Sequence, residues 1–431
     1  GYQPGVCRMA DSLRPIRSAI HGDRGGHGRG LPLSRAGETA GRGLRSVFLA
    51  AGLTTFGPLP AFLLGGLAVL VRDEIGFSEA RLGAAIAVFF AFAALGSVPA
   101  GWFAERIGAR RALPLGLVTA AGALGGMALA HAWWHLALAL AVAGMGHAVL
   151  QVGSNLLLAN DVPPGSQGLA FGIKQSAVPF ATLIAGAAVP LVGTNLGWRA
   201  AYAGTAIAAT LVVLGLAGHL RRGVRYPRPQ PRVPAAPFSR RQLLILAVAV
   251  GFGAASANAL AVFLVEYAVS TGMPVGRAGA LLATASLLGL TMRIAVGRWA
   301  DMRRSTDLLG VALLLVAGGT AFAALPAVDG GSALLWLAAA VAFSCGWGWP
   351  GLFTFIVAST NSHAPAAATG VVQTGVFAAA VIGPLLFGLT VSSVSYTAAW
   401  SGAAACQFIG AALIISVRQF RRAGRQEASH I

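Results

Sequence analysis

Apolar runs long enough to cross a lipid bilayer recur along almost the whole chain, and they restrict the possible folds more than any other feature. A helix of about 20 apolar residues spans the hydrocarbon core. Runs bounded by charge, Gly, Pro or Trp number twelve, at 47–71, 80–104, 110–131, 134–159, 167–193, 199–220, 242–268, 278–300, 307–327, 332–358, 368–393 and 396–417. The sequence therefore predicts an all-α membrane protein with twelve transmembrane helices.

The composition agrees with burial in a bilayer. Hydrophobic residues make up 56% of the chain and charged residues only 10%, with a mean hydropathy of +0.73. A soluble domain carries about 25% charged residues. The sequence contains no nucleotide-binding fingerprint, metal-ligand spacing or nucleophile constellation. We therefore predict no enzymatic activity, no cofactor and no metal.

One connection between the spans is unusual. Residues 221–241 contain seven arginines and no acid, with enough proline to stay extended. This segment divides six spans from six. We predict a disordered basic tail at 1–45, an N-terminal six-helix bundle at 46–220, a linker at 221–241, a C-terminal six-helix bundle at 242–417 and a second tail at 418–431.

The net charge of +18 has a membrane explanation. Most of the excess lies in the two tails and the linker, which an even number of spans places on one side of the membrane. The positive-inside rule makes that side cytoplasmic. We therefore expect a multi-pass protein of the bacterial inner membrane with both termini in the cytoplasm. We expect it to contact the lipid bilayer and not to bind nucleic acid.

A glycine, a carboxylate four residues later and then arginines follow both the second and the eighth span. The first copy consists of Gly101, Glu105, Arg106, Gly108, Arg110 and Arg111. The second copy keeps Gly297 and Asp301, offset by 196 residues. Spans 5 and 11 repeat a Gly-x-x-Gln pattern at an offset of 198 residues, from Gly172 and from Gly370. Two pairs with nearly equal offsets indicate a duplication with parallel repeats.

The loop from Gly101 to Arg111 resembles the G-x-x-x-[DE]-R-x-G-x-[RK]-[RK] motif of the major facilitator superfamily. The resemblance covers about 47–417 and implies two pseudo-symmetric six-helix bundles around a cavity that opens to each side in turn. We expect a monomer. The resemblance also implies that Glu105, Arg106, Arg110 and Asp301 latch the cytoplasmic side of the outward-open state. The alternative is that they are ordinary loop charges that support the topology.

Two cations lie inside predicted spans. Lys174, the one lysine of the chain, lies in span 5 beside Gln175, and Arg293 lies in span 8. A charge at the bilayer centre is expensive, so each needs a cavity, a partner or a short reach to the interface. In the superfamily, helices 5 and 8 meet between the bundles, where two cations would favour an anion.

Both cations lie in segments that resemble known branches of the superfamily. Arg293 with Gly297 resembles the helix 8 arginine that binds the substrate carboxylate in monocarboxylate and oxalate transporters. Lys174 and Gln175, with Gly172 before them and Pro179 after them, resemble helix 5 of cyanate and nitroimidazole permeases.

Span 4 presents His147, Gln151 and Asn155 at four-residue intervals, which predicts one helical face. This face could bind a polar substrate or pass a proton through His147; the alternative is interhelical hydrogen bonding. Glu266 is the second candidate proton carrier, or an interfacial acid. Trp347 and Trp349 form an aromatic wall or pack in the core. The predicted substrate ligands are Lys174, Arg293, Gln175, His147, Gln151, Asn155, Asn258 and Gln373.

These residues predict a secondary active transporter that moves a small organic or inorganic anion by alternating access, with a coupling proton as an option. The first alternative is a drug/proton antiporter. Such antiporters usually have an arginine in helix 4, where this chain has Leu140. A non-transporting membrane sensor is the second alternative, and it would need a soluble domain that the spans leave no room for.

Overall fold

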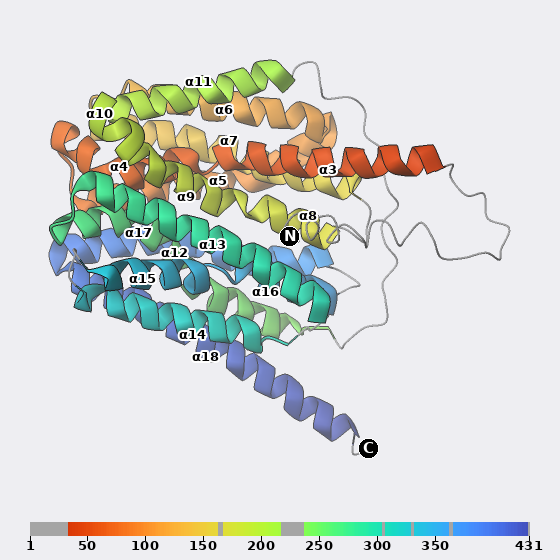
Figure 1. Ribbon diagram of the computed structural model, residues 1–431. Helices are drawn as coiled ribbons and strands as arrows, with labels where there is room; N and C mark the ends of the chain where they lie inside the picture. The colour runs from red at the N-terminus through yellow and green to blue at the C-terminus, as the bar shows by residue number, and fades with distance from the viewer. Residues whose placement is uncertain are drawn as a thin grey trace, which may run out of the picture. The chain divides into compact units, whose positions relative to one another are not determined.

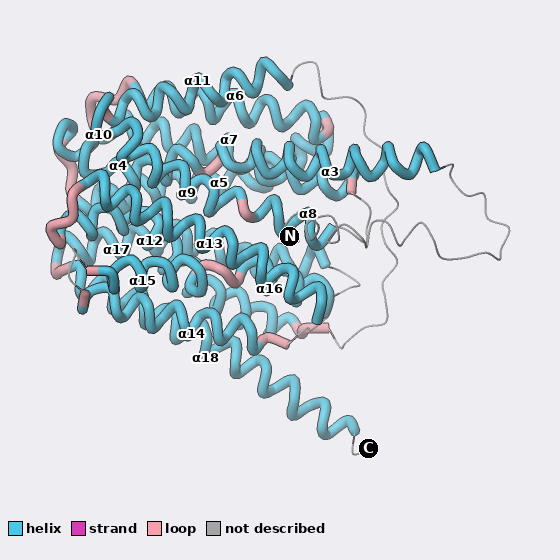
Figure 2. Tube along the Cα trace, in the orientation of Figure 1, coloured by secondary structure: helices cyan, strands magenta, loops and turns pink. Residues whose placement is uncertain are grey.

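The computed structural model describes residues 33–162, 167–216, 237–303, 307–328, 332–361 and 365–429. Figure 2 shows that these segments consist of helices and the loops between them, without strands. Most of the predicted tail 1–45 and most of the predicted linker 221–241 lie outside these ranges. Apart from the start of the first helix, the bounds of the tails, linker and bundles stay predictions.

The helices follow the order of the predicted spans. The first six spans are α3 (Leu33–Phe56) with α4 (Leu59–Ile75), then α5 (Glu79–Ile107), α6 (Ala109–Ala128), α7 (Trp133–Asp161), α8 (Gln167–Gln175) continued by α9 (Ala177–Ala188), the π-helical turn η2 (Val189–Gly193) and α10 (Thr194–Leu196), and finally α11 (Trp198–Leu216). The second six are α12 (Arg240–Ser270), α13 (Val275–Arg303), α14 (Leu309–Ala324) with the 3-10 turn η3 (Leu325–Ala327), α15 (Ala333–Val341) with the π-helical turn η4 (Ala342–Gly346) and α16 (Pro350–Thr360), α17 (Pro365–Ser393) and α18 (Tyr396–Ser429).

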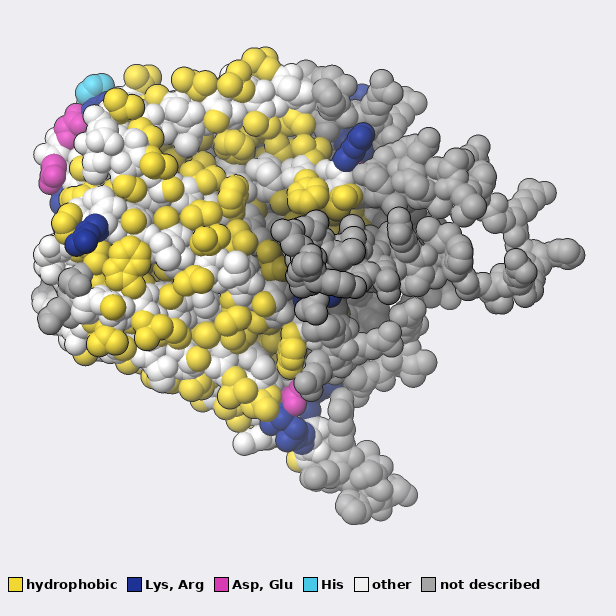
Figure 3. All heavy atoms as spheres, viewed as in Figure 1, with side chains coloured by type: hydrophobic (Ala, Val, Ile, Leu, Met, Phe, Trp, Pro, Cys, Tyr) yellow, Lys and Arg dark blue, Asp and Glu magenta, His cyan; other side chains and the backbone are white. Residues whose placement is uncertain are grey.

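The helix lengths confirm the predicted fold class. Within the described ranges, eleven helical stretches are long and apolar enough to cross a membrane. The pair Gly43–Phe56 and Leu59–Ile75, bent by 45°, makes a twelfth when it is counted as one span. In Figure 3 hydrophobic side chains, many of them large, cover the long side of the helices, as a surface in contact with lipid requires.

One prediction about the N-terminal tail is wrong. Helix α3 begins at Leu33, so residues 33–45, which the sequence assigns to a disordered tail, are helical. The physical reason is cooperativity: once the membrane span forms a helix, each further residue adds one hydrogen bond without a new nucleation step.

Three spans are interrupted in mid-course, and proline explains where. In the first span the break between α3 and α4 lies at Gly57 and Pro58. In the fifth it lies at Ser176, three residues before Pro179. In the tenth it lies before Pro350, the first residue of α16. Proline lacks the N–H that a helix interior needs, so it favours such breaks.

The two bundles contact each other chiefly through three pairs of helices: α4 with α12, α5 with α17, and α9 with α13. We call the end at which α4, α6, α10, α12, η3 and α17 finish the short-loop end, on the left of Figure 1. The opposite end, at which α5, α7, α11, α13, α16 and α18 finish, is the linker end. Figure 1 also shows α4, α9, α12 and α13 running side by side through the middle of the bundles.

Glycines allow the closest approaches between the bundles. A methyl group on Gly65 of α4 would lie 2.7 Å from Cα of Val262 on α12. A methyl group on Gly186 of α9 would lie 2.8 Å from the carbonyl oxygen of Gly279 on α13. Among the described glycines, these approaches between bundles all lie towards the short-loop end, so the bundles are joined most tightly there.

Candidate functional site

A cavity of about 120 Å³ lies between the two bundles. On the N-terminal side α4, α5, α7, α8 and α9 contribute lining residues, and on the C-terminal side α12, α13, α16 and α17 do so. The breaks in the first, fifth and tenth spans all supply lining side chains, namely Pro58, Gln175 and Trp347. The interrupted helices therefore place backbone carbonyls and polar side chains beside the cavity.

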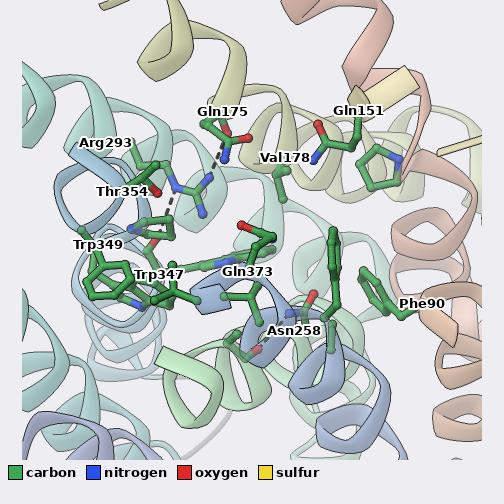
Figure 4. Close-up of a pocket in the computed structure, with 18 of the residues that line it drawn as sticks. Phe90, Gln151, Gln175, Val178, Asn258, Arg293, Trp347, Trp349, Thr354 and Gln373 are labelled. Atoms are coloured by element: carbon green, nitrogen blue, oxygen red, sulfur yellow. Dashed lines mark hydrogen bonds between the residues drawn. The ribbon is translucent and has the colours of Figure 1, made fainter. Parts of the chain in front are cut away.

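Arg293 is the cation that lines this cavity. Its side chain is 9% exposed, and its Nε donates to the carbonyl oxygen of Trp347 at 3.0 Å. One terminal nitrogen donates to the carbonyl oxygen of Gln175 at 2.9 Å, and the guanidinium carbon lies 5.2 Å from the centre of the Trp347 ring. Figure 4 shows the guanidinium held between these two residues. No carboxylate pairs with Arg293 among the described residues, so its positive charge is not neutralised.

Lys174 lies behind the cavity wall. Its side chain is 1% exposed, and its ammonium donates to Oε1 of Gln151 on α7. Gln151 lines the cavity, whereas Lys174 does not. The two buried cations are therefore separated: Arg293 reaches the cavity directly, and Lys174 reaches it through the Gln151 amide.

The remaining predicted ligands divide in the same way. Side chains of His147, Gln175, Asn258 and Gln373 line the cavity with Gln151. Asn155 does not line it and is exposed, so the structure does not bring this member of the predicted face to the cavity. Each four-residue step overshoots one turn by about 40°, so two steps rotate Asn155 by about 80° away from His147.

Asn258 and His147, two polar residues that line the cavity, differ in their hydrogen bonding. The Asn258 amide nitrogen donates to the carbonyl oxygen of Ala254 at 2.8 Å, which leaves the Asn258 oxygen as an acceptor. The buried Nδ1 of His147 has no hydrogen-bond partner within the described part of the chain. His147 lies beside Phe89, with 5.4 Å between ring centres.

Aromatic side chains form a large share of the apolar lining. The aromatic wall consists of Phe62, Phe90, Trp347, Trp349, Phe353 and Phe377. Phe62 and Trp347 meet edge to face across the two bundles, with ring centres 5.9 Å apart. The Trp349 indole N–H is bound to the Gly346 carbonyl at 3.0 Å. The two tryptophans stand out in the sequence but the four phenylalanines do not, because a phenylalanine in an apolar span gives no signal of facing a cavity.

Of the charges in the loop motif from Gly101 to Arg111, Arg110 is the one with an ion pair among the described residues. Arg110 forms an ion pair with Asp161 at the end of α7, and the Ser46 hydroxyl donates to the same carboxylate at 2.6 Å. Glu105 and Arg106 are exposed, without a partner in the described part of the chain. The side chain of Asp301 lies outside the described residues. Sequence analysis missed Asp161, because no pattern links it to Arg110 over 51 residues.

The motif glycines have different reasons to be glycine. Gly108 ends α5 with a φ of 85°, a conformation that side chains disfavour. Methyl groups on Gly101 and Gly297 would meet nothing within 4 Å. Arg111 is exposed.

Glu266 is buried at the short-loop end and does not line the cavity. It forms an ion pair with Arg72 of α4, and Arg72 also binds Glu79 of α5 at 2.8 Å. Because Glu266 belongs to α12, its ion pair joins the two bundles. This buried, paired position differs from that of an exposed interfacial acid.

Comparisons with known proteins agree with this architecture. The family model described as Major Facilitator Superfamily matches residues 46–384. A bacterial homolog of the human lysosomal transporter Spinster, solved inward-facing and unoccupied, is similar with a TM-score of 0.66 and 16% identity, over 88% of this chain and 96% of that one. A D-xylose-proton symporter is similar with a TM-score of 0.65 and 16% identity, over 86% and 97% of the two chains. No curated protein matches the chain in sequence. Because the family model matches most of its length, the chain belongs to the Major Facilitator Superfamily of membrane transporters.

Proposed function

We propose that this transporter is a secondary carrier for a small organic or inorganic anion. The observation that carries the proposal is Arg293, a buried guanidinium that lines the cavity without a carboxylate partner in the described part of the chain. An uncompensated buried charge is costly, and a bound anion offsets that cost. Arginine suits this role because its planar N–H groups match a carboxylate in two places.

Alternating access is the proposed mechanism of transport. The bundles are joined at the short-loop end by the glycine approaches and by the Arg72–Glu266 ion pair. Opening that end requires these contacts to separate, while the linker end closes. We propose that Glu105, Arg106 and Asp301 form contacts in that second state, and that both termini are cytoplasmic in a monomer of the bacterial inner membrane.

Coupling to protons has two proposed carriers. His147 lines the cavity, so its protonation would act directly on a bound anion. Glu266 would act on the contact between the bundles, because a neutral Glu266 no longer attracts Arg72. Transport measured with and without an imposed pH gradient in His147→Asn and Glu266→Gln separates the two roles.

The aromatic wall favours a second candidate function. Six aromatic side chains suit a lipophilic drug, the substrate of a drug/proton antiporter. The unpaired Arg293 opposes this for lipophilic cations, because both charges have the same sign. We therefore rank anion transport first.

Thermal stabilisation by ligands tests the choice. Purified protein is heated with benzoate, cyanate or nitrate and, separately, with tetraphenylphosphonium. A ligand that binds only the folded state raises the unfolding midpoint, and we expect this for at least one anion. Arg293→Gln should abolish the rise. Arg277→Gln on the same helix should keep it, because Arg277 is exposed and lies outside the cavity. Stabilisation by the lipophilic cation alone would replace anion transport with drug efflux.

A further inference from the structure

The orientation of the Gln151 amide is set from behind by Lys174. A protonated lysine has only hydrogen-bond donors, so the Gln151 atom that it contacts must be the oxygen. Lys174 is 1% exposed and has no carboxylate partner among the described residues, so this contact is its main polar interaction there. The Gln151 amide nitrogen is left over, and Gln151 lines the cavity. Gln151 therefore presents N–H donors to a ligand and no acceptor.

The opposite side of the cavity presents a charge. Figure 4 places Arg293 and Gln151 on opposite sides of the cavity, on α13 and α7. Two of the five N–H groups of Arg293 are used by backbone carbonyls. Carbonyl oxygens orient the guanidinium but leave its net charge in place, so the remaining N–H groups can bind an anionic group.

The aromatic wall, which includes Phe62 and Trp347, lines the same cavity as these two groups. Arg293 is the one lining cation among the described residues. A dianion would therefore leave its second charge without a partner, which is costly in a buried site. An anion with a wholly apolar far end would leave the Gln151 N–H groups unsatisfied, and a site built to hydrogen-bond a ligand discriminates against that.

Resting on the anion function proposed above, we infer that the cavity takes a monocarboxylate with a flat apolar body and a neutral hydrogen-bond acceptor at its far end. The carboxylate binds Arg293, the body packs against the aromatic wall, and the acceptor binds the Gln151 amide. Lys174 is a positioning residue: it acts on the ligand only through Gln151.

A pair of matched ligands tests the acceptor. In 4-methoxybenzoate an ether oxygen replaces one methylene group of 4-ethylbenzoate, while charge and length are nearly the same. Calorimetric titration of the purified full chain should show 4-methoxybenzoate binding about five- to tenfold more tightly, as one added hydrogen bond in a buried site provides. Terephthalate, a dianion, should bind more weakly than either. Equal affinity for the matched pair, or tighter binding of terephthalate, would overturn the inference.

Variants separate positioning from general damage to the site. Lys174→Met frees the Gln151 amide to rotate, so the preference for the methoxy ligand should fall to about one. Lys174→Arg keeps the donors and should keep the preference. Gln151→Met should also remove it, and adding Lys174→Met to Gln151→Met should change the ratio no further. If Lys174→Met only damaged the site in general, it would weaken the binding of both ligands equally. The ratio of the two affinities would then stay unchanged, which would contradict the positioning role of Lys174.

Arg293→Gln distinguishes failure of this inference from failure of the anion function. This variant should weaken the binding of 4-methoxybenzoate and of 4-ethylbenzoate to the same extent. If Arg293→Gln leaves both affinities unchanged, the anion function itself fails. If Arg293→Gln abolishes binding while Lys174→Met leaves the ligand ratio intact, only the role of Lys174 and the acceptor fails.

Discussion

At the scale of single residues, the two buried cations show how the surroundings decide a role. Arg293 is held by the backbone carbonyls of Trp347 and Gln175, which lie at the breaks of the tenth and fifth spans. Lys174 is held by the Gln151 side chain. Broken helices free carbonyl groups that an intact helix would use internally. Backbone carbonyls hold Arg293 in place at the cavity. Lys174 acts on the cavity only by orienting the Gln151 amide.

Gly108 carries a prediction at this scale. Its φ of 85° and ψ of 146° lie in a region that is essentially restricted to glycine. We expect Gly108→Ala to reduce the free energy of unfolding by about 1–3 kcal/mol. The measurement is the midpoint of thermal unfolding of the purified protein.

Gly101→Ala is the matched control for this prediction. Gly101 lies inside α5, and a methyl group there meets nothing within 4 Å. Alanine favours a helix over glycine, so this variant should be at least as stable as the parent. Equal effects of the two substitutions would show that the backbone conformation of Gly108 does not matter.

At the scale of elements, the contact between α9 and α13 depends on the absence of side chains. Gly186 and Gly279 face each other, and each would clash with the other helix if it carried a methyl group. Gly65 on α4 and Gly83 on α5 make similar approaches to α12 and α17. Small residues let helix backbones approach closely in membranes, where packing and not the hydrophobic effect drives association.

Gly186→Val should therefore separate α9 from α13. We expect a loss of about 1–3 kcal/mol in stability, the usual effect of overpacking, seen as a lower thermal midpoint. Gly204→Val on α11 is the control, because its added side chain begins in open space. A Gly186→Val protein as stable as the Gly204→Val protein would contradict the close contact.

The ion pair between Asp307 and Arg418 ties the start of α14 to α18 and predicts a dependence on pH. Its N–O distances are 2.5 and 2.7 Å. The hydrogen bond from Arg418 holds the pKa of the Asp307 carboxyl below its usual value. A lowered pKa in the folded state adds stability above the unfolded pKa of about 3.9, and this stability is lost as the pH falls through the folded value.

We therefore expect Asp307→Asn to lower the thermal midpoint slightly near neutral pH and to leave it unchanged in strong acid. The effect is small because Asp307 is 39% exposed, and exposed pairs contribute little. The measurement is the midpoint difference between the two proteins across the acid range. A difference that grows as the pH falls would contradict the sign.

At the scale of the whole molecule, ion pairs at the short-loop end fall into two groups. The Arg72–Glu266 pair joins α4 to α12 and so connects the bundles. The Arg199–Glu74 pair joins α11 to α4 within one bundle. Only the first pair must break for the short-loop end to open, so only the first can bias the two states of the transporter.

Glu266→Gln should therefore populate the state that is open at the short-loop end. In a protein without its native cysteines, Val178→Cys places a thiol in the cavity. We expect Glu266→Gln to raise the rate of its labelling from the short-loop side several-fold, because the variant weakens an attraction made in one state only. Glu74→Gln should leave the rate unchanged. Equal rates in both variants would exclude the Arg72–Glu266 pair as a gate.

The sequence by itself determined the number and position of the spans and the family. These are local properties: a bilayer demands about 20 apolar residues per helix, and the motif from Gly101 to Arg111 is contiguous. The cost of a buried charge also singled out Arg293 and Lys174 before any contact was known.

Only the tertiary structure decided which polar groups share the cavity. The rotation of each helix about its axis depends on its neighbours, so the sequence could not separate Arg293, which lines the cavity, from Lys174, which lies behind it. Asn155 does not line the cavity with His147 and Gln151. The Arg72–Glu266 pair joins residues from different bundles. No local pattern specifies such contacts, because they arise only when distant helices pack together.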